Sequence, residues 1–198
     1  MNFFKYFFKA YIKKNIITNY KRKKIGNVGL DVLLEEPLDY GDHPEGICIE
    51  SGTTILRNSR LNIYENEKNE SYVIKIGKNC YIGSYFSILA KGRVIIGDNV
   101  LIASNVIIAS ENHGMNPELD EPYMSQKLTG KQVNIGDGCW IGEKVVILPG
   151  CSIGKKCIIG AGSVVTKSIP DFCIAVGNPA KVIKGYNFEK HMWEGGYK

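Results

Sequence analysis

The chain has 198 residues, of which 44% are hydrophobic and 23% are charged. This length and composition allow one substantial hydrophobic core and exclude a disordered or fibrous protein. The net charge is +5, but residues 1–24 contain eight lysine and arginine residues and no acid. Their charge of +8 leaves −3 for residues 25–198, which argues against a basic nucleic-acid-binding domain.

Residues 1–24 are predicted to form a short basic amphipathic helix. Their aromatic and aliphatic side chains recur at helical spacing, with a second stripe of lysines. Such a helix either lies on an anionic membrane surface or packs on the rest of the protein or a sister subunit. The lysines interrupt the apolar centre that a secretory signal needs, and no run of about 18 apolar residues predicts a spanning helix. We therefore expect a cytoplasmic protein, peripheral to the inner face of the membrane if the first alternative holds.

From Ile76 onward the chain repeats every six residues. The first series reads IGKNCY, IGSYFS, ILAKGR and, after two residues, IGDNVL, IASNVI, IASENH; the second begins at Ile135 as IGDGCW, IGEKVV, ILPGCS, IGKKCI, IGAGSV, VTKSIP. A period of six fits neither a helix nor a simple alternating strand, and it predicts a solenoid with three short strands per coil. The leading residue should point inward and the fifth partly so. A glycine in second position allows close backbone approach or an unusual turn conformation.

The six cysteines follow the same repeat. None forms a C-x-x-C pair or neighbours a histidine, so neither a zinc site nor a redox pair is predicted. Four of them, Cys80, Cys139, Cys151 and Cys157, occupy the fifth position, where a thiol serves as a small hydrophobic group. We expect no metal in the protein.

Over residues 47–185 the chain resembles the left-handed parallel β-helix acyltransferases of the hexapeptide-repeat class. Three segments carry the resemblance: IGDNVLIASNVIIASENHG (96–114), VNIGDGCWIGEKVVILPGCSIGKKCIIGAGSVVTKSIP (133–170) and AVGNPAKVIK (175–184). In this order they are similar to acetyl-CoA-dependent sugar O-acetyltransferases, including the galactoside and maltose enzymes and those of capsule and O-antigen synthesis. The resemblance implies an all-β fold with a left-handed parallel β-helix over residues 25–185. It also implies acetyl-CoA as the acetyl donor and a homotrimer with active sites between subunits.

The repeats stop after His113 and resume at Val133, so residues 114–131 are predicted to form an extruded loop. In the resembled family this loop reaches over a neighbouring subunit. His113 is the only histidine in the repeat region, and an imidazole can take a proton from an attacking hydroxyl near neutral pH. The resemblance implies that His113 is the general base. Glu111 should lie on the same side and orient the ring, a task that a backbone carbonyl could also perform.

For the cofactor, the resemblance implies contacts from Trp140, Gly142, Ala161, Thr166, Lys167 and Lys184. Gly142 and Ala161 would leave a groove for the pantetheine arm, and the two lysines would meet the phosphates. On the acceptor side, the asparagine that binds sugar in the resembled enzymes aligns near Gly83 or Ser84, so its contacts are not reproduced. Tyr81, Tyr85 and Phe86 are candidates for a sugar-stacking surface, or alternatively for packing between subunits.

Residues 186–198 are predicted to form a C-terminal tail. Its segment NFEKHMWEGG should form a small helix or turn that caps the last coil, because an open solenoid end exposes strand edges and core.

The leading functional hypothesis is O-acetylation of a sugar or glycan acceptor, free or lipid-linked, in capsule, exopolysaccharide or O-antigen synthesis. Direct attack in a ternary complex would suffice, with His113 as base. Two alternatives keep the same base and donor: N-acetylation of an amino-sugar nucleotide and O-acetylation of a small non-sugar acceptor such as serine. A trimeric scaffold is the non-enzymatic alternative. A zinc-dependent β-helix hydratase is excluded, because it needs three histidine ligands and only His113 lies in the repeats.

Overall fold

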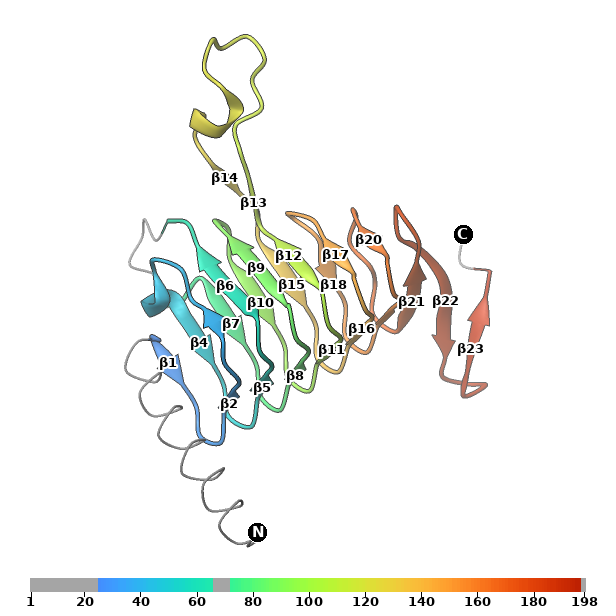
Figure 1. The fold of residues 1–198 in the computed structure, drawn as a ribbon. Helices are drawn as coiled ribbons and strands as arrows, with labels where there is room; N and C mark the ends of the chain where they lie inside the picture. Colours follow the sequence, from blue (N-terminus) through green and yellow to red (C-terminus); the bar gives the residue numbers. More distant parts are fainter. Residues whose placement is uncertain (1–24, 66–71, 197–198) are drawn as a thin grey trace, which may run out of the picture.

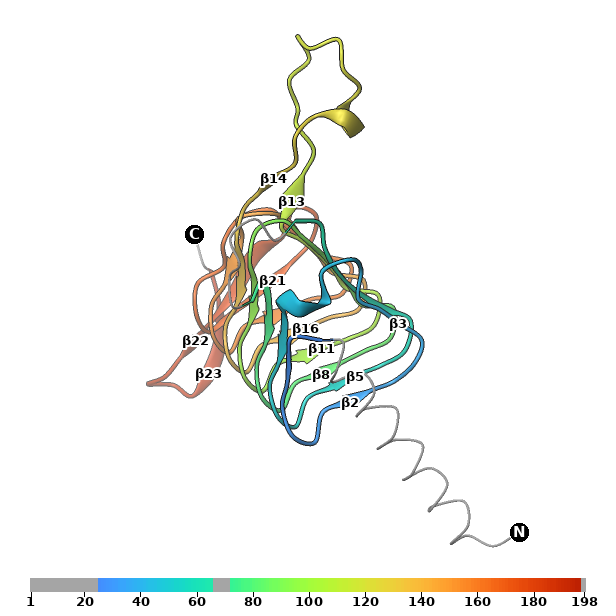
Figure 2. The ribbon, with the colours of Figure 1, turned by 90° about the vertical axis from the view of Figure 1, so that its left-hand side faces the viewer.

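The computed structural model describes residues 25–65 and 72–196, so the predicted helix over residues 1–24 lies outside the described residues. The chain winds into a three-sided prism whose faces are stacks of parallel strands (Figures 1 and 2). Three parallel sheets of this kind are typical of a left-handed β-helix. The predicted all-β architecture of stacked coils is therefore confirmed. In the part of the chain so described, no helix is long and apolar enough to cross a membrane.

Each coil contributes one short strand to each of three sheets, which we name A, B and C. Sheet A contains, in spatial order, β1 (Asn27–Val28), β4 (Ile47–Ile49), β7 (Ile74–Ile76), β10 (Val94–Ile96), β15 (Val133–Ile135) and β18 (Ser152–Ile153). Sheet C contains β3 (Leu38–Asp39), β6 (Ser59–Ile63), β9 (Ser87–Ala90), β12 (Ile107–Ala109), β17 (Val146–Ile147) and β20 (Val164–Val165).

Sheet B extends beyond the prism at its C-terminal end. It contains β2 (Leu33–Leu34), β5 (Thr54–Ile55), β8 (Tyr81–Ile82), β11 (Leu101–Ile102), β16 (Trp140–Ile141), β19 (Ile158–Ile159), β21 (Cys173–Val176), β22 (Lys181–Asn187) and β23 (Met192–Gly195). A separate pair, β13 (Glu111–Asn112) with β14 (Thr129–Gly130), forms the stem of the loop, and two short 3-10 turns, η1 (Pro44–Gly46) and η2 (Tyr123–Ser125), complete the described elements.

The six-residue period sets which side chains fill the prism. All twelve leading residues, from Ile76 to Val165, are buried, as predicted. In sheet B, Ile82, Ile102, Ile141 and Ile159 occupy matching positions on four successive strands. Strands in a sheet lie about 4.8 Å apart, so these side chains stack into a continuous apolar ladder along the prism axis. This ladder removes a large apolar area from water, which is the main driving force for folding.

Two positions of the repeat, the second and the fourth, determine the backbone geometry at the corners. The second-position glycine permits close approach: a Cβ on Gly97 would lie 2.8 Å from the backbone nitrogen of Asp137 in the next coil. The left-handed backbone conformation instead falls on the fourth position, where Asn79 has φ 55° and Asn99 has φ 56°. Asparagine tolerates this conformation better than most residues. Of the two roles that sequence left open for the second-position glycine, the structure therefore assigns close approach.

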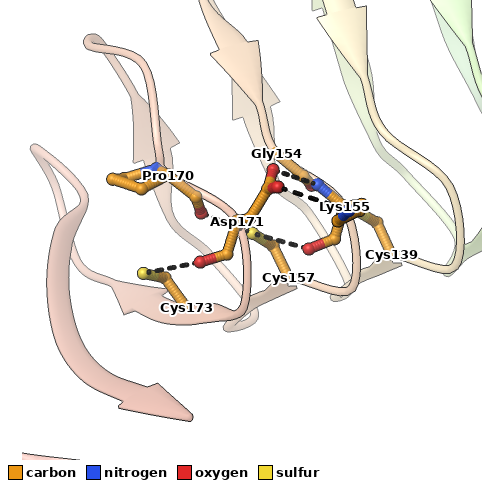
Figure 3. A network of polar contacts seen from close by, with 7 residues as sticks. All are labelled: Cys139, Gly154, Lys155, Cys157, Pro170, Asp171 and Cys173. Atoms are coloured by element: carbon orange, nitrogen blue, oxygen red, sulfur yellow. Dashed lines mark hydrogen bonds and ion pairs between the residues drawn. The ribbon is translucent and has the colours of Figure 1, made fainter.

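Buried thiols line one corner of the prism, beside the Asp171 carboxylate (Figure 3). The Cys139 thiol donates to the Gly154 carbonyl and the Cys157 thiol to the Pro170 carbonyl, both at 2.9 Å. The Asp171 carboxylate accepts the backbone N–H of Lys155 at 2.9 Å. All six cysteines are free and buried, and within the described residues no His, Cys, Asp and Glu side chains gather into a metal site. Four of them, Cys80, Cys139, Cys151 and Cys157, are buried in the core, as the interpretation of their fifth position predicted.

The C-terminal cap is a β-hairpin. Strand β21 continues sheet B in parallel, whereas β22 and β23 add to it in antiparallel order, with a turn over residues 188–191. The predicted helix or turn in NFEKHMWEGG is therefore corrected to a turn between two strands. The predicted boundary at residue 185 falls inside β22, because the hairpin satisfies the open edge of the last coil by direct strand pairing.

Candidate functional site

The candidate site lies where the chain leaves the prism after β12 and returns at β15 (Figure 1). Ser110, which is fully buried, fixes this junction. Its hydroxyl donates to the Gly92 carbonyl at 2.6 Å, while its own carbonyl accepts the N–H groups of Gly92 at 3.3 Å and Lys131 at 2.8 Å. The departing and returning segments are thus tied to the neighbouring coil. These hydrogen bonds fix the position at which the stem of the loop begins.

His113 follows the stem strand β13 and is exposed. Glu111, two residues earlier, is half-buried and lies on β13, whereas His113 lies just beyond the end of that strand. The Glu111 Oε2 atom is buried and finds no hydrogen-bond partner among the residues that the structure describes. A buried acceptor without a donor costs free energy, so this oxygen is suited to accept a donor from a group that reaches the site.

The loop beyond the stem is organised by one buried side chain, Gln126. Its Nε2 donates to the carbonyls of Asn116 at 3.0 Å and Glu121 at 3.3 Å, and its Oε1 accepts the Asn116 N–H at 3.0 Å. A Cβ on Gly114 would lie 2.7 Å from the Gln126 Cβ, so the loop closes tightly around this residue. Sequence reasoning missed both Gln126 and Ser110. The serine stood in a recognisable repeat block, but nothing in the loop sequence distinguished the glutamine.

The ordered loop presents apolar side chains to solvent. Met115, Leu119, Tyr123 and Met124 are all exposed, Met124 to 80%. Exposed apolar clusters of this kind mark interaction surfaces. The protrusion of the loop from the prism edge is plain in both ribbon views (Figures 1 and 2).

The six predicted cofactor residues fall in three places. Trp140 is half exposed on the outer face of sheet B, in one row with Ile158, Ile174 and finally Lys184 on β22. Gly142 and Ala161 meet at the corner after sheet B, where a Cβ on Gly142 would lie 2.7 Å from the Ala161 nitrogen. Thr166 and Lys167 follow β20 at the next corner and are exposed. The structure therefore brings together Gly142 with Ala161 and aligns Trp140 with Lys184, but it does not gather all six around one cavity of this chain.

Two of the three predicted acceptor residues are accessible. Tyr81 is 48% exposed and shares an outward row with Leu101 and Trp140, and Tyr85 is 58% exposed at the following corner. Phe86 is fully buried in the core. Its proposed part in a sugar-stacking surface is therefore wrong: it is the fifth residue of its block, and its ring fills the prism.

Comparison with known protein families agrees with this architecture. The family described as "Bacterial transferase hexapeptide (six repeats)" matches residues 132–167, and the "Hexapeptide repeat of succinyl-transferase" matches residues 73–110. The two matches lie on either side of the extruded loop and cover coils of the prism.

Individual proteins match over a longer stretch. The chain is 41% identical to galactoside O-acetyltransferase of Escherichia coli K12 over 126 residues, which cover 63% of this chain and 61% of that protein. It is 40% identical to a putative lipopolysaccharide biosynthesis O-acetyl transferase, WbbJ, of the same organism over 128 residues, covering 62% and 65% of the two chains. The alignments thus span slightly less than two thirds of these relatives. A solved structure of a galactoside acetyltransferase in complex with coenzyme A superposes with a TM-score of 0.60 and 30% identity, covering 89% of this chain and 74% of that one.

Proposed function

Because the chain belongs to the hexapeptide-repeat acetyltransferase family, we propose that it transfers acetyl from acetyl-CoA to a hydroxyl of a sugar or polysaccharide precursor. We infer a sugar acceptor from the names of the relatives, which are O-acetyltransferases of a galactoside and of lipopolysaccharide biosynthesis. The second of these favours a capsule, exopolysaccharide or O-antigen precursor. The donor follows the coenzyme A bound to the galactoside enzyme. Since acetyl-CoA is a cytoplasmic metabolite, the reaction belongs on the cytoplasmic side.

The observation that carries this proposal is the placement of His113. It is exposed, so its imidazole is accessible, and it lies three residues after Ser110, whose hydrogen bonds fix the start of the stem. In the proposed reaction the imidazole accepts the proton of the acceptor hydroxyl as the oxygen attacks the thioester carbonyl carbon. The carbon–sulfur bond then breaks, and the protonated imidazole returns the proton to the departing coenzyme A thiolate. A backbone N–H would stabilise the oxyanion.

Glu111 is proposed to hold the imidazole in position. Its buried Oε2 has no hydrogen-bond partner among the described residues, His113 included, so it is an open acceptor two residues from the imidazole that it would orient. As a positioning residue, Glu111 should affect turnover more than donor binding. Glu111→Gln is expected to lower kcat while the KM for acetyl-CoA stays unchanged; an altered KM alone would argue against it.

The donor is proposed to lie along the outside of two neighbouring coils, that of β15, β16 and β17 and that of β18, β19 and β20. Gly142 packs closely on the next coil, so the small, exposed Ala161 is the residue that would leave room for the pantetheine arm, with Trp140 beside it and Thr166, Lys167 and Lys184 towards the phosphates. Because these residues do not share one cavity of the single chain, we propose that a second copy completes the site in a homotrimer. The exposed apolar loop and the outward row Tyr81, Leu101 and Trp140 support such contacts. Light scattering that finds only a monomer would contradict it.

Membrane attachment through residues 1–24 stays a prediction, since that segment lies outside the described residues. Flotation with anionic liposomes tests it. The intact chain should float and a variant lacking residues 1–24 should not; equal behaviour of the two would remove the prediction.

Release of coenzyme A thiol from acetyl-CoA tests the main proposal. The purified protein is assayed with monosaccharides, oligosaccharides, nucleotide sugars, amino sugars and serine, which separates O-acetylation of sugars from the other acceptor classes. We expect acceptor-dependent release that falls about 10²- to 10⁴-fold in His113→Ala, the usual contribution of a general base. His43→Ala is the matched control, because His43 pairs with Glu45 in a separate turn and should keep full activity. Wild-type turnover that survives in His113→Ala would overturn the role of His113.

A further inference from the structure

The loop over residues 114–131, which projects from the prism beyond the stem of β13 and β14, closes around a polar side chain (Figure 1). All of these residues are described, and among them only Gln126 is buried, with 6% of its surface exposed. Burial of an amide is unfavourable unless its polar atoms form hydrogen bonds. A loop that buries a glutamine and leaves its apolar side chains in solvent therefore depends on the hydrogen bonds that this glutamine makes.

Those hydrogen bonds hold the chain just after His113. The Gln126 carboxamide forms two of them with a single residue, Asn116: its Oε1 accepts the Asn116 N–H and its Nε2 donates to the Asn116 carbonyl, both at 3.0 Å. The third runs from Nε2 to the Glu121 carbonyl at 3.3 Å. Two hydrogen bonds to one residue fix both the position and the direction of its backbone. The chain is thus held three residues beyond His113.

Gly114 brings the same side chain against the residue next to His113. A Cβ at Gly114 would lie 2.7 Å from the Gln126 Cβ and 2.9 Å from its Oε1. The backbone of Gly114 is not in the left-handed region, so close packing is the reason for a glycine at this position. Gln126 therefore touches the loop on both sides of Met115.

His113 consequently lies between two held neighbours. Before it, Asn112 pairs with Thr129 in the stem, and the Thr129 hydroxyl also donates to the Asn112 carbonyl at 3.4 Å. After it, Gly114 packs on Gln126. The His113 side chain itself is exposed. A functional group on a loop is placed less precisely than one on a strand, unless packing and hydrogen bonds around it restrict its movement.

We propose that Gln126 is a positioning residue for His113, which it holds where the imidazole can reach the acceptor hydroxyl. The inference rests on the proposed function, in which that imidazole accepts the hydroxyl proton. Gln126 acts through the backbone of Gly114 and Asn116. Proton transfer requires hydrogen-bond distance, and a displacement of about 1 Å can cost about 10²-fold in rate. Loss of these contacts should therefore lower turnover and leave donor binding unchanged.

Steady-state acetyl transfer, with the acceptor found in the thiol-release assay, tests this inference. Gln126→Met keeps the size of the side chain and removes its three hydrogen bonds. We expect kcat to fall about 10- to 100-fold, while the KM for acetyl-CoA and the midpoint of urea denaturation stay close to those of the wild type. Gln132→Met is the matched control, because the exposed Gln132 bonds to the Asn134 side chain on β15 and not to the loop. An unchanged kcat in Gln126→Met would overturn the inference.

Gly114→Ala reaches the same contact from the other side and leaves the Gln126 carboxamide intact, so it also serves if Gln126→Met does not fold. Its added Cβ pushes Gln126 away from the residue next to His113, and kcat should again fall at least tenfold. Gly195→Ala is the matched control, since the nearest atom to a Cβ there, the Ile183 carbonyl oxygen, is 3.8 Å away. A kcat in Gly114→Ala equal to that of this control would contradict the proposed contact.

The imidazole signals of the three histidines separate this inference from the proposed function. In NMR spectra of the full chain labelled with ¹³C at histidine Cε1, the His113 signal is identified by its absence in His113→Ala. It should shift or broaden in Gln126→Met, while the signals of His43 and His191 stay in place. An unmoved His113 signal would overturn the inference even where acetyl transfer is observed. If the wild type transfers no acetyl group, the proposed function fails, and the His113 signal alone decides whether Gln126 positions the imidazole.

Discussion

The prism and the extruded loop are stabilised in different ways. In the prism, each buried side chain has equivalents above and below it: Ile102 lies between Ile82 and Ile141 in the same ladder. In the loop, one side chain, Gln126, makes three hydrogen bonds that join Asn116 and Glu121 across residues 114–126; the other hydrogen bonds within this segment join residues only two or three apart. The prism therefore resists local change because its contacts are repeated. The loop can alter shape through a single residue, which suits a segment that borders the candidate site.

Removal of one ladder residue tests the first half of this comparison and should have the largest effect. Ile102→Ala empties a fully buried position in the middle of sheet B, and such a change costs about 2–5 kcal/mol of unfolding free energy. Ile183→Ala is the control, because Ile183 lies on β22, outside the stacked coils, and is 43% exposed; it should change stability by no more than about 0.5 kcal/mol. Urea denaturation measures both. Similar losses in the two variants would contradict the proposed packing.

The fold was predictable because the same physical demand recurs in every block. A leading Ile or Val repeats over all twelve blocks and a small or β-branched fifth residue over ten of them, so exceptions such as Phe86 and the polar Asn112 do not hide the pattern. The sequence did not fully predict that the second position allows close approach while the fourth takes the left-handed conformation. Glycine suits both close backbone approach and a left-handed conformation, and only the structure showed which of the two occurs at the second position. The C-terminal hairpin was missed because its pairing with β21 is antiparallel and leaves the six-residue period.

The candidate site was predictable only where it touched the repeat. His113 was identified because it ends the last regular block before the loop, whereas Gln126 lies in a segment without periodicity. Phe86 shows the opposite error. Its fifth position in the block already indicated burial, but its aromatic ring suggested a sugar contact. In the structure the ring is fully buried in the core. Gln126, which lies outside the repeat, orders the loop, whereas Phe86, which follows the repeat, fills the interior.

Loss of the Gln126 side chain tests the second half of the comparison. In Gln126→Ala the Asn116 N–H and the carbonyls of Asn116 and Glu121 lose their partner, so the local opening free energy should fall by about 1–3 kcal/mol. Hydrogen exchange should therefore accelerate at the Asn116 amide, while the global unfolding free energy changes little. Gln132→Ala is the control, because the exposed Gln132 side chain bonds to the half-buried Asn134 side chain on β15 and not to the loop. An unchanged exchange rate at Asn116 would show that other contacts order the loop.

The smallest expected effect concerns the prism alone: the buried Cys80 thiol should make the unfolding free energy depend on pH. Burial is the main cause that raises the pKa of the Cys80 thiol. An unfolded thiol ionises from about pH 8.5, whereas the buried thiol keeps its proton, so the folded state loses stability as pH rises above that value. Cys80→Ala has no thiol to titrate. Between pH 7.5 and 9.5 its unfolding free energy should therefore fall by about 1 kcal/mol less than that of the wild type. Equal pH slopes in urea titrations would mean that Cys80 titrates normally, and that the corner is open to water rather than sealed by the stacked coils.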